Sequence, residues 1–468
     1  MIRNKFSEMF RNIFVTIALL FAVTLSAKAV GKSGMYQYSV QLRGYISPET
    51  GKEPTAYLWV PDGCHRVKAV MFAQQNMTEE TIYKMASFRK RMSELGVALL
   101  WVAPAFTNTW DPQSGCLQVF DEMLTAIAYQ SGHKEIINAP IIPFGHSAQA
   151  TMPWNFAAWN NDRTLCIISF HGDAPRTNLC GYGTANVEWG RTRNIDGIPG
   201  LMVEGEYEWW EARVLPALAF RMMYPGSCIS FLCDAGRGHF DCSEATAEYI
   251  AKFIEKSIAT RLGGKTLKKV NPCDGWLACR YDADLPANDG DGSGAEVFSI
   301  AERPQPAPYA EYKGDRHDAF WYFDREMAEL TEARYAETRG KKMQYVGFEY
   351  GGQNVPYDEK KQGGMAIDFT PKKGSLILRI KAVYTDSTHV AVSKSHSKAQ
   401  PRVDVISGPV EKIDDETFRI VPYEAGMDNP RRSFSVWLVA VGEGDEEYKT
   451  AVQPIQIRLP KDIISLLR

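Results

Sequence analysis

The feature that most constrains the fold is an alternation of short apolar runs with helix-like stretches between about residues 36 and 262. Helical character falls at Thr78–Leu95 and Leu117–Tyr129. The apolar runs of strand length are Tyr57–Val60, Ala69–Ala73, Val97–Val102, Ile141–Phe144, Cys166–Phe170 and Gly200–Val203. Runs that are apolar at every position are typical of strands buried on both faces. The alternation therefore predicts an α/β fold with a doubly wound, mostly parallel sheet.

The pattern changes after residue 264. Residues 265–342 are expected to form a linker and one amphipathic helix at Asp318–Glu337. Beyond them the expected strands are Leu376–Tyr384, Val390–Ser393, Thr417–Val421, Phe434–Val441 and Ile455–Leu459. Alternation of apolar and polar residues in two of these runs fits half-exposed antiparallel strands. The sequence thus predicts an α/β domain over residues 30–264 and a β-sandwich-like domain over residues 343–468.

Residues 1–29 have the pattern of a signal peptide. Three basic residues precede a short apolar run, Phe14–Leu25, and Ala27-Lys28-Ala29 offers a cleavage site between small residues. The run is shorter than the about 20 apolar residues that span a bilayer. We therefore expect cleavage, a secreted or periplasmic mature chain, and no stable membrane insertion.

Composition excludes several classes of protein. Hydrophobic residues make up 45% of the chain and charged residues 23%, which is ordinary globular usage and excludes a disordered or collagen-like chain. The net charge is −3 and no long run of Lys or Arg is present, so a nucleic-acid partner is not expected.

The chain contains nine cysteines, and an exported protein permits disulfides. Cys273 with Cys279 is the first pair we expect, and Cys233 with Cys242 is the second. The odd number leaves at least one thiol free or paired between chains. No CxxC spacing occurs, so a zinc site is not expected.

The strongest local motif is Gly145-His146-Ser147-Ala148-Gln149-Ala150, which follows an apolar run and precedes a helix-like stretch. A serine between small residues at such a strand-to-helix turn is typical of a nucleophile elbow. Ala150 stands where a second glycine is more usual. We take Ser147 as the candidate nucleophile.

A serine nucleophile needs a base, and on this type of sheet the chain order is serine, acid, histidine. His239 lies in the glycine-flanked loop Gly236–Phe240, just before a helical stretch. This loop context and its place in the order favour His239 over the other histidines that follow Ser147.

The acid is expected in the loop after the strand that contains Leu201–Val203. Glu208 is preferred there, and Glu206 and Glu204 remain open. Asp173, which follows the preceding strand, is a further candidate.

Two backbone N–H groups should stabilise an oxyanion, and we expect those of Ala148 and Gln75. Trp209, Trp210 and Trp110 lie in or near loops of the same half. Their flat rings suit sugars or phenolic groups, so they are candidate substrate-binding residues, with core packing as the alternative.

Residues 36–262 resemble the α/β-hydrolases, closest in style to secreted esterases of the polyhydroxybutyrate-depolymerase and feruloyl-esterase group. The resemblance rests on the Ser147 turn, the Glu-rich loop at 204–208 and Gly238-His239-Phe240. It implies a Ser–His–acid triad that cleaves esters through an acyl-enzyme without metal or organic cofactor.

We therefore expect an exported serine ester hydrolase whose partner is an ester substrate, possibly borne on a polysaccharide. A peptidase or lipase of the same fold is one alternative. The other is a non-catalytic protein that binds glycan or protein, and it predicts that Ser147, Glu208 and His239 do not converge.

Overall fold

The computed structural model describes residues 35–47, 51–178, 185–208, 210–282, 303–371, 375–422, 435–460 and residue 463. The predicted signal peptide at residues 1–29 lies outside the described residues, as do Cys180 and Trp209. Among the helices described, none combines the length and the apolar character that a membrane crossing requires.

An eight-stranded sheet forms the centre of the α/β part, in the order β1-β2-β4-β3-β5-β6-β7-β8. The first two strands pair antiparallel, whereas β3 to β8 run parallel. The strands are β1 (Tyr38–Gln41), β2 (Thr55–Trp59), β3 (Ala69–Gln74), β4 (Val97–Ala103), β5 (Ile141–His146), β6 (Ile167–Phe170), β7 (Pro199–Gly205) and β8 (Cys228–Asp234). The predicted doubly wound, mostly parallel sheet is confirmed.

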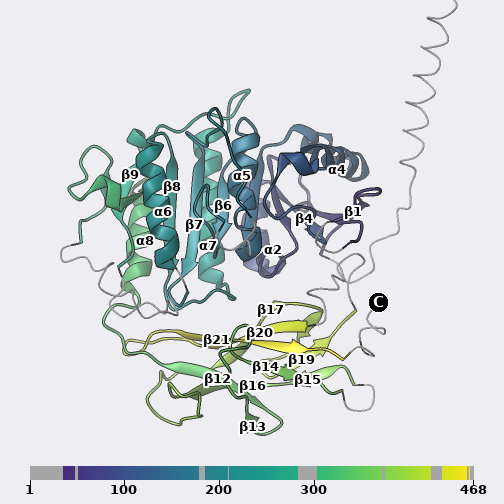
Figure 1. Cartoon of the computed structure of the whole chain (residues 1–468), viewed down its shortest axis with the longest axis vertical. Coiled ribbons are helices and arrows are strands. Elements are labelled where there is room, and N and C mark those ends of the chain that lie inside the picture. Colours follow the sequence, from purple (N-terminus) through teal and green to yellow (C-terminus); the bar gives the residue numbers. More distant parts are fainter. Residues whose placement is uncertain are drawn as a thin grey trace, which may run out of the picture. The chain divides into compact units, whose positions relative to one another are not determined.

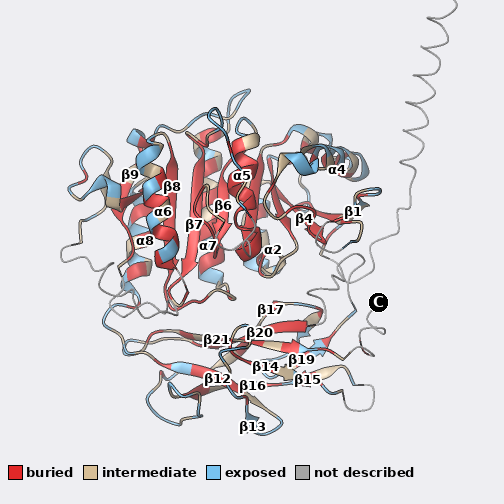
Figure 2. Cartoon of the chain, in the orientation of Figure 1, coloured by how far each residue is buried: buried red, intermediate tan, exposed pale blue. Residues whose placement is uncertain are grey.

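Helices cover both faces of this sheet (Figure 1). Alternate strand residues point to opposite layers: Met71 and Leu99 join one hydrophobic cluster, and Phe72 joins the other. Strands β5 to β8 are buried along their whole length (Figure 2). The helices are α2 (Glu79–Lys84), α3 (Ala86–Leu95), α4 (Cys116–Ser131), α5 (Met152–Trp159), α6 (Trp210–Met223) and α7 (Glu244–Arg261).

One predicted helix is two. The stretch Thr78–Leu95 breaks at Met85, whose backbone is extended with φ −62° and ψ 124°. The first of the two helices, α2, is short and begins directly after the loop that follows β3.

The segment expected to be a linker is part of the packed structure. It holds a small sheet in the order β10-β9-β11 and the helix α8. These elements are β9 (Trp276–Cys279), β10 (Ala307–Pro308), β11 (Ala319–Tyr322) and α8 (Arg325–Ala336). The helix predicted from Asp318 thus begins later, because its first aromatic residues form β11. Tyr322 donates a hydrogen bond to the carbonyl of Phe231 on β8, at 2.7 Å.

The C-terminal part is a β domain of three sheets around one hydrophobic cluster. The run predicted at Leu376–Tyr384 is divided into two strands, and Val390–Ser393 contributes only one isolated bridge, at Ala391. The strands are β12 (Tyr345–Tyr350), β13 (Gln353–Asn354), β14 (Ala366–Asp368), β15 (Ile377–Arg379), β16 (Lys381–Thr385), β17 (Arg402–Ser407), β18 (Val410–Lys412), β19 (Thr417–Ile420), β20 (Ser435–Gly442) and β21 (Ala451–Arg458).

Strand β20 is buried on both of its faces. Leu438 and Ala440 belong to the cluster inside the β domain. Trp437 and Val439 point the other way, into a second cluster with Phe240, which lies in the α/β part. The two parts of the chain therefore share a hydrophobic contact.

The expected disulfides are not formed. Cys273 and Cys279 are both free thiols, and so are Cys233 and Cys242. Cys233 lies in the buried strand β8 and Cys279 ends β9, and the structure pairs neither of them with another cysteine. Both predicted pairings are therefore wrong.

Trp110 lies in the core of the α/β part and is 0% exposed. Its ring centroid is 4.6 Å from that of Phe156 and 5.3 Å from that of Phe120. Aromatic contacts of this kind stabilise a core beyond the area that they bury.

We expect Trp110→Ala to lower the free energy of unfolding by about 3–5 kcal/mol, because it empties a large buried volume. Urea unfolding measures the change. Tyr129→Ala is the matched control, because that ring is 64% exposed, and it should change stability by no more than about 0.5 kcal/mol. Equal effects of the two substitutions would contradict the core assignment.

Candidate active site

The candidate nucleophile Ser147 stands directly after β5, on a turn that leads toward α5. Its φ of +52° lies in the left-handed region, which is unfavourable for any residue with a side chain. Gly145 makes the turn possible, because a Cβ there would lie 2.1 Å from the carbonyl oxygen of Gln149. A strained serine between strand and helix has the geometry of a nucleophile elbow.

The departure at Ala150 from the usual second glycine has a structural explanation. A Cβ on Gly172 would lie 1.9 Å from the Cβ of Ala150. Only one of these two positions can carry a methyl group. In this chain Ala150 carries it, and Gly172 has no side chain. The close packing that the turn requires is therefore kept.

The structure brings the three predicted triad residues together at the carboxyl ends of parallel strands. The Nε2 atom of His239 lies 2.8 Å from Ser147 Oγ, and its Nδ1 atom lies 2.5 Å from Glu208 Oε2. Because an ionised carboxylate only accepts hydrogen bonds, Nδ1 carries the proton toward Glu208. Nε2 is then the atom that can accept the serine proton.

Of the four carboxylates considered for the acid, Glu208 is the one that contacts His239. The other three are also buried. They have other partners within hydrogen-bond distance: Glu204 accepts from the Gly172 N–H, Asp173 from the Thr151 hydroxyl, and Glu206 from Lys449.

A second histidine, His171, contacts the same carboxylate as His239. Its Nδ1 atom is hydrogen-bonded to Glu208 Oε1, and its side chain is fully buried. Burial by itself would raise the pKa of Glu208, but the two imidazoles outweigh it and hold that pKa well below its ordinary value. Burial likewise opposes the charge on His171, but Glu208 outweighs it and raises the pKa of His171.

The sequence did not predict that His171 contacts the triad acid, although its position directly after a buried strand could have indicated it. It is the first residue after β6, and its φ is +49°. The sequence directed attention to Asp173 two residues later, as an acid. The imidazole at the strand end is what reaches Glu208.

The loop after β3 is tied to the nucleophile turn by a buried carboxylate, Glu79. One of its oxygens accepts the N–H of His146 at 2.9 Å, and the other accepts the N–H of Met77 at 2.9 Å. His146 in turn makes a 2.8 Å hydrogen bond from Nε2 to the carbonyl of His239. Burial, together with the repulsion that a protonated His239 or His171 would exert, holds the pKa of His146 well below its ordinary value. The neutral ring therefore links the serine turn to the histidine loop.

One predicted oxyanion donor needs correction. The N–H of Gln75 donates to the carbonyl of Val102 at 2.8 Å, so it is not available to a substrate. The next residue, Asn76, lies against the nucleophile strand, where its side chain donates to the carbonyl of His146 at 2.5 Å. Among the described residues, the backbone N–H of Asn76 makes no hydrogen bond. The N–H of Asn76 is therefore the candidate donor in place of that of Gln75, beside the N–H of Ala148 in the first turn of a short helix.

The tryptophans predicted as substrate platforms lie elsewhere. Trp210 is 0% exposed and packs edge-to-face against Tyr281, with ring centroids 4.9 Å apart. Trp110 is the core residue described above, and Trp209 lies outside the described residues. A fully buried indole offers no face to a sugar, so Trp110 and Trp210 are core residues.

The spacing of His171, Glu208 and His239 would also permit a metal ion. One ligand atom from each lies within 4.8 Å of the others, and they form the one such group among the residues that the structure describes. In the structure the Nδ1 atoms of both histidines are hydrogen-bonded to the carboxylate of Glu208.

The known proteins to which this chain is similar are found among solved structures. No protein-family model matches the sequence, and no curated protein matches it. The chain is similar to a fluorophosphonate-binding serine hydrolase of Staphylococcus aureus at 14% identity and a TM-score of 0.33, over 47% of this chain and 97% of that one. It is similar to Est1E of Butyrivibrio proteoclasticus at 17% identity and a TM-score of 0.31, over 47% of this chain and 99% of that one. It is also similar to the carboxylesterase of Bacillus cereus at 12% identity and a TM-score of 0.31, over 43% of this chain and 93% of that one.

We expect Gly172→Ala to destabilise the protein by about 1–3 kcal/mol, because the new methyl group overlaps Ala150. The double variant Ala150→Gly/Gly172→Ala should recover most of this loss, since one methyl group is again absent. Denaturant unfolding of the single and double variants measures the coupling. Additive effects would contradict the contact.

We expect His171→Gln to destabilise the protein by roughly 1.5–3 kcal/mol at pH 6, because a hydrogen bond to a charged group is altered. The raised pKa of His171 means that its stabilisation is fully present below its ordinary pKa of about 6.5 and is lost as pH rises through the folded-state pKa.

The difference in melting temperature between wild type and His171→Gln should therefore be larger at pH 6 than at pH 9. His317→Gln is the control, because the side chain of His317 is 66% exposed. A difference that does not change with pH would show that the charge on His171 contributes nothing.

Proposed function

We propose that this chain, whose α/β part has the strand order and nucleophile turn of the α/β-hydrolase fold, is an exported serine ester hydrolase that acts through an acyl-enzyme. The observation that carries the proposal is the unbroken series of contacts from Ser147 through His239 to Glu208, at 2.8 and 2.5 Å. Export is supported by the signal-peptide pattern of residues 1–29.

The reaction follows from the roles of these atoms. His239 Nε2 takes the hydroxyl proton while Ser147 Oγ attacks the ester carbonyl. Glu208 keeps the imidazole in the required tautomer and stabilises its cation. The N–H groups of Ala148 and Asn76 stabilise the oxyanion. His239 then protonates the leaving alcohol, and water attacks the acyl-enzyme with His239 again as the base.

For the substrate we propose an acyl group esterified to a carbohydrate. The tryptophan platforms no longer support the carbohydrate, so this part of the proposal rests on the predicted export and on the resemblance. Release of acetate or ferulate from decorated glycans, with casein and a long-chain triglyceride alongside, separates an esterase from a peptidase or a lipase.

The hypothesis of a non-catalytic binding protein expects the three residues to lie apart. Ser147 and His239 lie within hydrogen-bond distance of each other, and so do His239 and Glu208. These distances support a catalytic function over a decayed site.

We expect the purified protein to react with a fluorophosphonate probe, and Ser147→Ala to abolish labelling, because the probe requires an activated hydroxyl. Glu208→Gln should lower ester hydrolysis by about 10³–10⁴-fold, because His239 loses the carboxylate that sets its tautomer. Ser114→Ala removes an exposed hydroxyl and serves as the matched control. Absence of labelling in a folded wild-type protein would overturn the proposed function.

A further inference from the structure

Two loops carry the acid and the base of the proposed triad, and both contact the C-terminal β domain. The acid loop comprises residues 205–208 and ends at Glu208. The histidine loop comprises residues 235–241 and contains His239. The strands β20 and β21 and their connection, residues 443–450, form a hairpin that touches both loops.

Glu206 joins all three segments. Its Oε1 atom lies 2.6 Å from Nζ of Lys449 in the hairpin connection, and the side chains are 6% and 1% exposed. Its Oε2 atom accepts the N–H of Gly236, in the histidine loop, at 2.9 Å. Tyr281 adds a third hydrogen bond, at 3.0 Å. A buried charge of this kind is held firmly only while its partners stay in place.

Tyr207, directly before the proposed acid, makes a second connection. Its hydroxyl donates to the carbonyl of Thr450 at 2.7 Å, and its backbone N–H donates to the carbonyl of Arg237 at 2.9 Å. The backbone next to Glu208 is thus fixed both to the hairpin and to the histidine loop.

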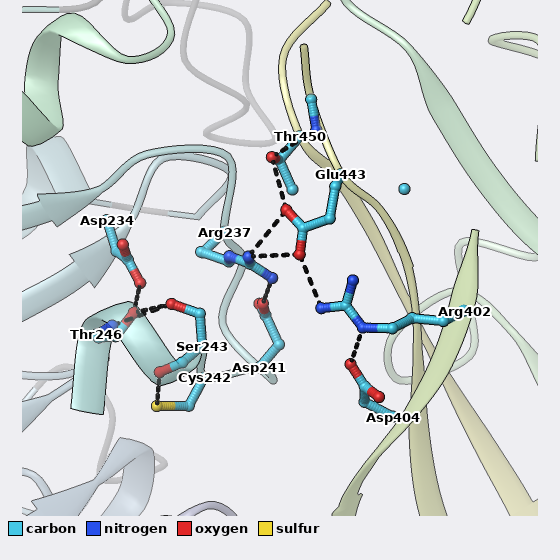
Figure 3. A network of polar contacts seen from close by, with 12 residues as sticks. Asp234, Arg237, Asp241, Cys242, Ser243, Thr246, Arg402, Asp404, Glu443 and Thr450 are labelled. Carbon is cyan, nitrogen blue, oxygen red and sulfur yellow. Dashed lines mark hydrogen bonds and ion pairs between the residues drawn. The ribbon is translucent and has the colours of Figure 1, made fainter. Parts of the chain in front are cut away.

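The histidine loop has its own contacts with the β domain (Figure 3). The guanidinium of Arg237 lies 3.3 Å from the carboxylate of Glu443, which also accepts from Arg402 on β17 at 2.7 Å. On the other side of His239, the ring of Phe240 stacks on Trp437 of β20, with centroids 5.4 Å apart and an interplanar angle of 17°.

These contacts flank the triad residues in sequence. Residues 206 and 207 precede Glu208, and residues 237 and 240 lie on either side of His239. A shift of about 1 Å in a catalytic group can lower a rate by 10²-fold. The position of both groups therefore depends on the β domain, although none of its residues is in the triad.

We propose that the C-terminal β domain is a working part of the active site, with Lys449 and Trp437 as positioning residues that hold Glu208 and His239 in register with Ser147. The inference rests on the proposed function for its catalytic consequence. Its structural consequence does not depend on catalysis: the acid loop and the histidine loop should lose order when their contacts with the hairpin are removed.

The test uses the full chain and the variant Lys449→Met. We expect the maximal rate of fluorophosphonate labelling to fall by about 10²-fold, with little change in the concentration that half-saturates it. Hydrogen exchange of peptides covering residues 204–208 and 235–241 should become faster. Lys342→Met is the matched control, because it removes an exposed lysine that pairs with Glu447 in the same connection. It should change neither readout.

The double variant Glu206→Gln/Lys449→Met separates positioning from stability and replaces the single variant if that fails to fold. No unpaired charge stays buried in it, so its melting temperature should return toward that of the wild type. Labelling should stay slow, because the charged link between acid loop and hairpin is absent. If the labelling rate recovered together with the melting temperature, the inference would be overturned, and the β domain would only stabilise the fold.

The two proposals can fail separately. A folded wild-type protein that does not react with the probe overturns the proposed function, while loop exchange in the variants still decides whether the hairpin orders the two loops. A wild type that reacts, with variants that react equally fast and exchange equally slowly, overturns the inference alone.

Discussion

The buried carboxylate of Glu208 is the interaction on which the candidate site depends. Its two oxygens face two different imidazoles, those of His239 and His171, and the N–H of Gly205 donates to it as well. A charge removed from water is tolerated only when it is paired and hydrogen-bonded. Glu208 therefore constrains both rings, and through His239 it constrains the group that faces Ser147.

This arrangement is possible because parallel strands end at one edge of the sheet. Ser147, His171, Glu208 and His239 follow β5, β6, β7 and β8 in turn, so neighbouring strands deliver neighbouring side chains. Close packing completes the arrangement, since Gly172 leaves room for the methyl group of Ala150. The chemistry proposed for the site thus depends on the register of strands β5 to β8 and on the absence of a side chain at Gly172.

The β domain extends this dependence beyond the catalytic half. Strand β20 is apolar at nearly every position because it faces its own domain on one side and Phe240 on the other. The buried pair of Glu206 and Lys449 adds a charged contact at the neighbouring loop. Domains that share a continuous apolar contact and a buried ion pair are expected to move together.

The sequence by itself determined the fold class, because apolar runs of strand length and a small-residue turn around Ser147 are local patterns. The chain order of serine, acid and histidine also pointed to His239 and to the loop that contains Glu208. Tertiary structure alone decided which carboxylate contacts His239, that His171 shares it, and that the N–H of Gln75 is already bonded. These outcomes depend on which side chains meet across strands distant in sequence, and no local pattern encodes such a meeting.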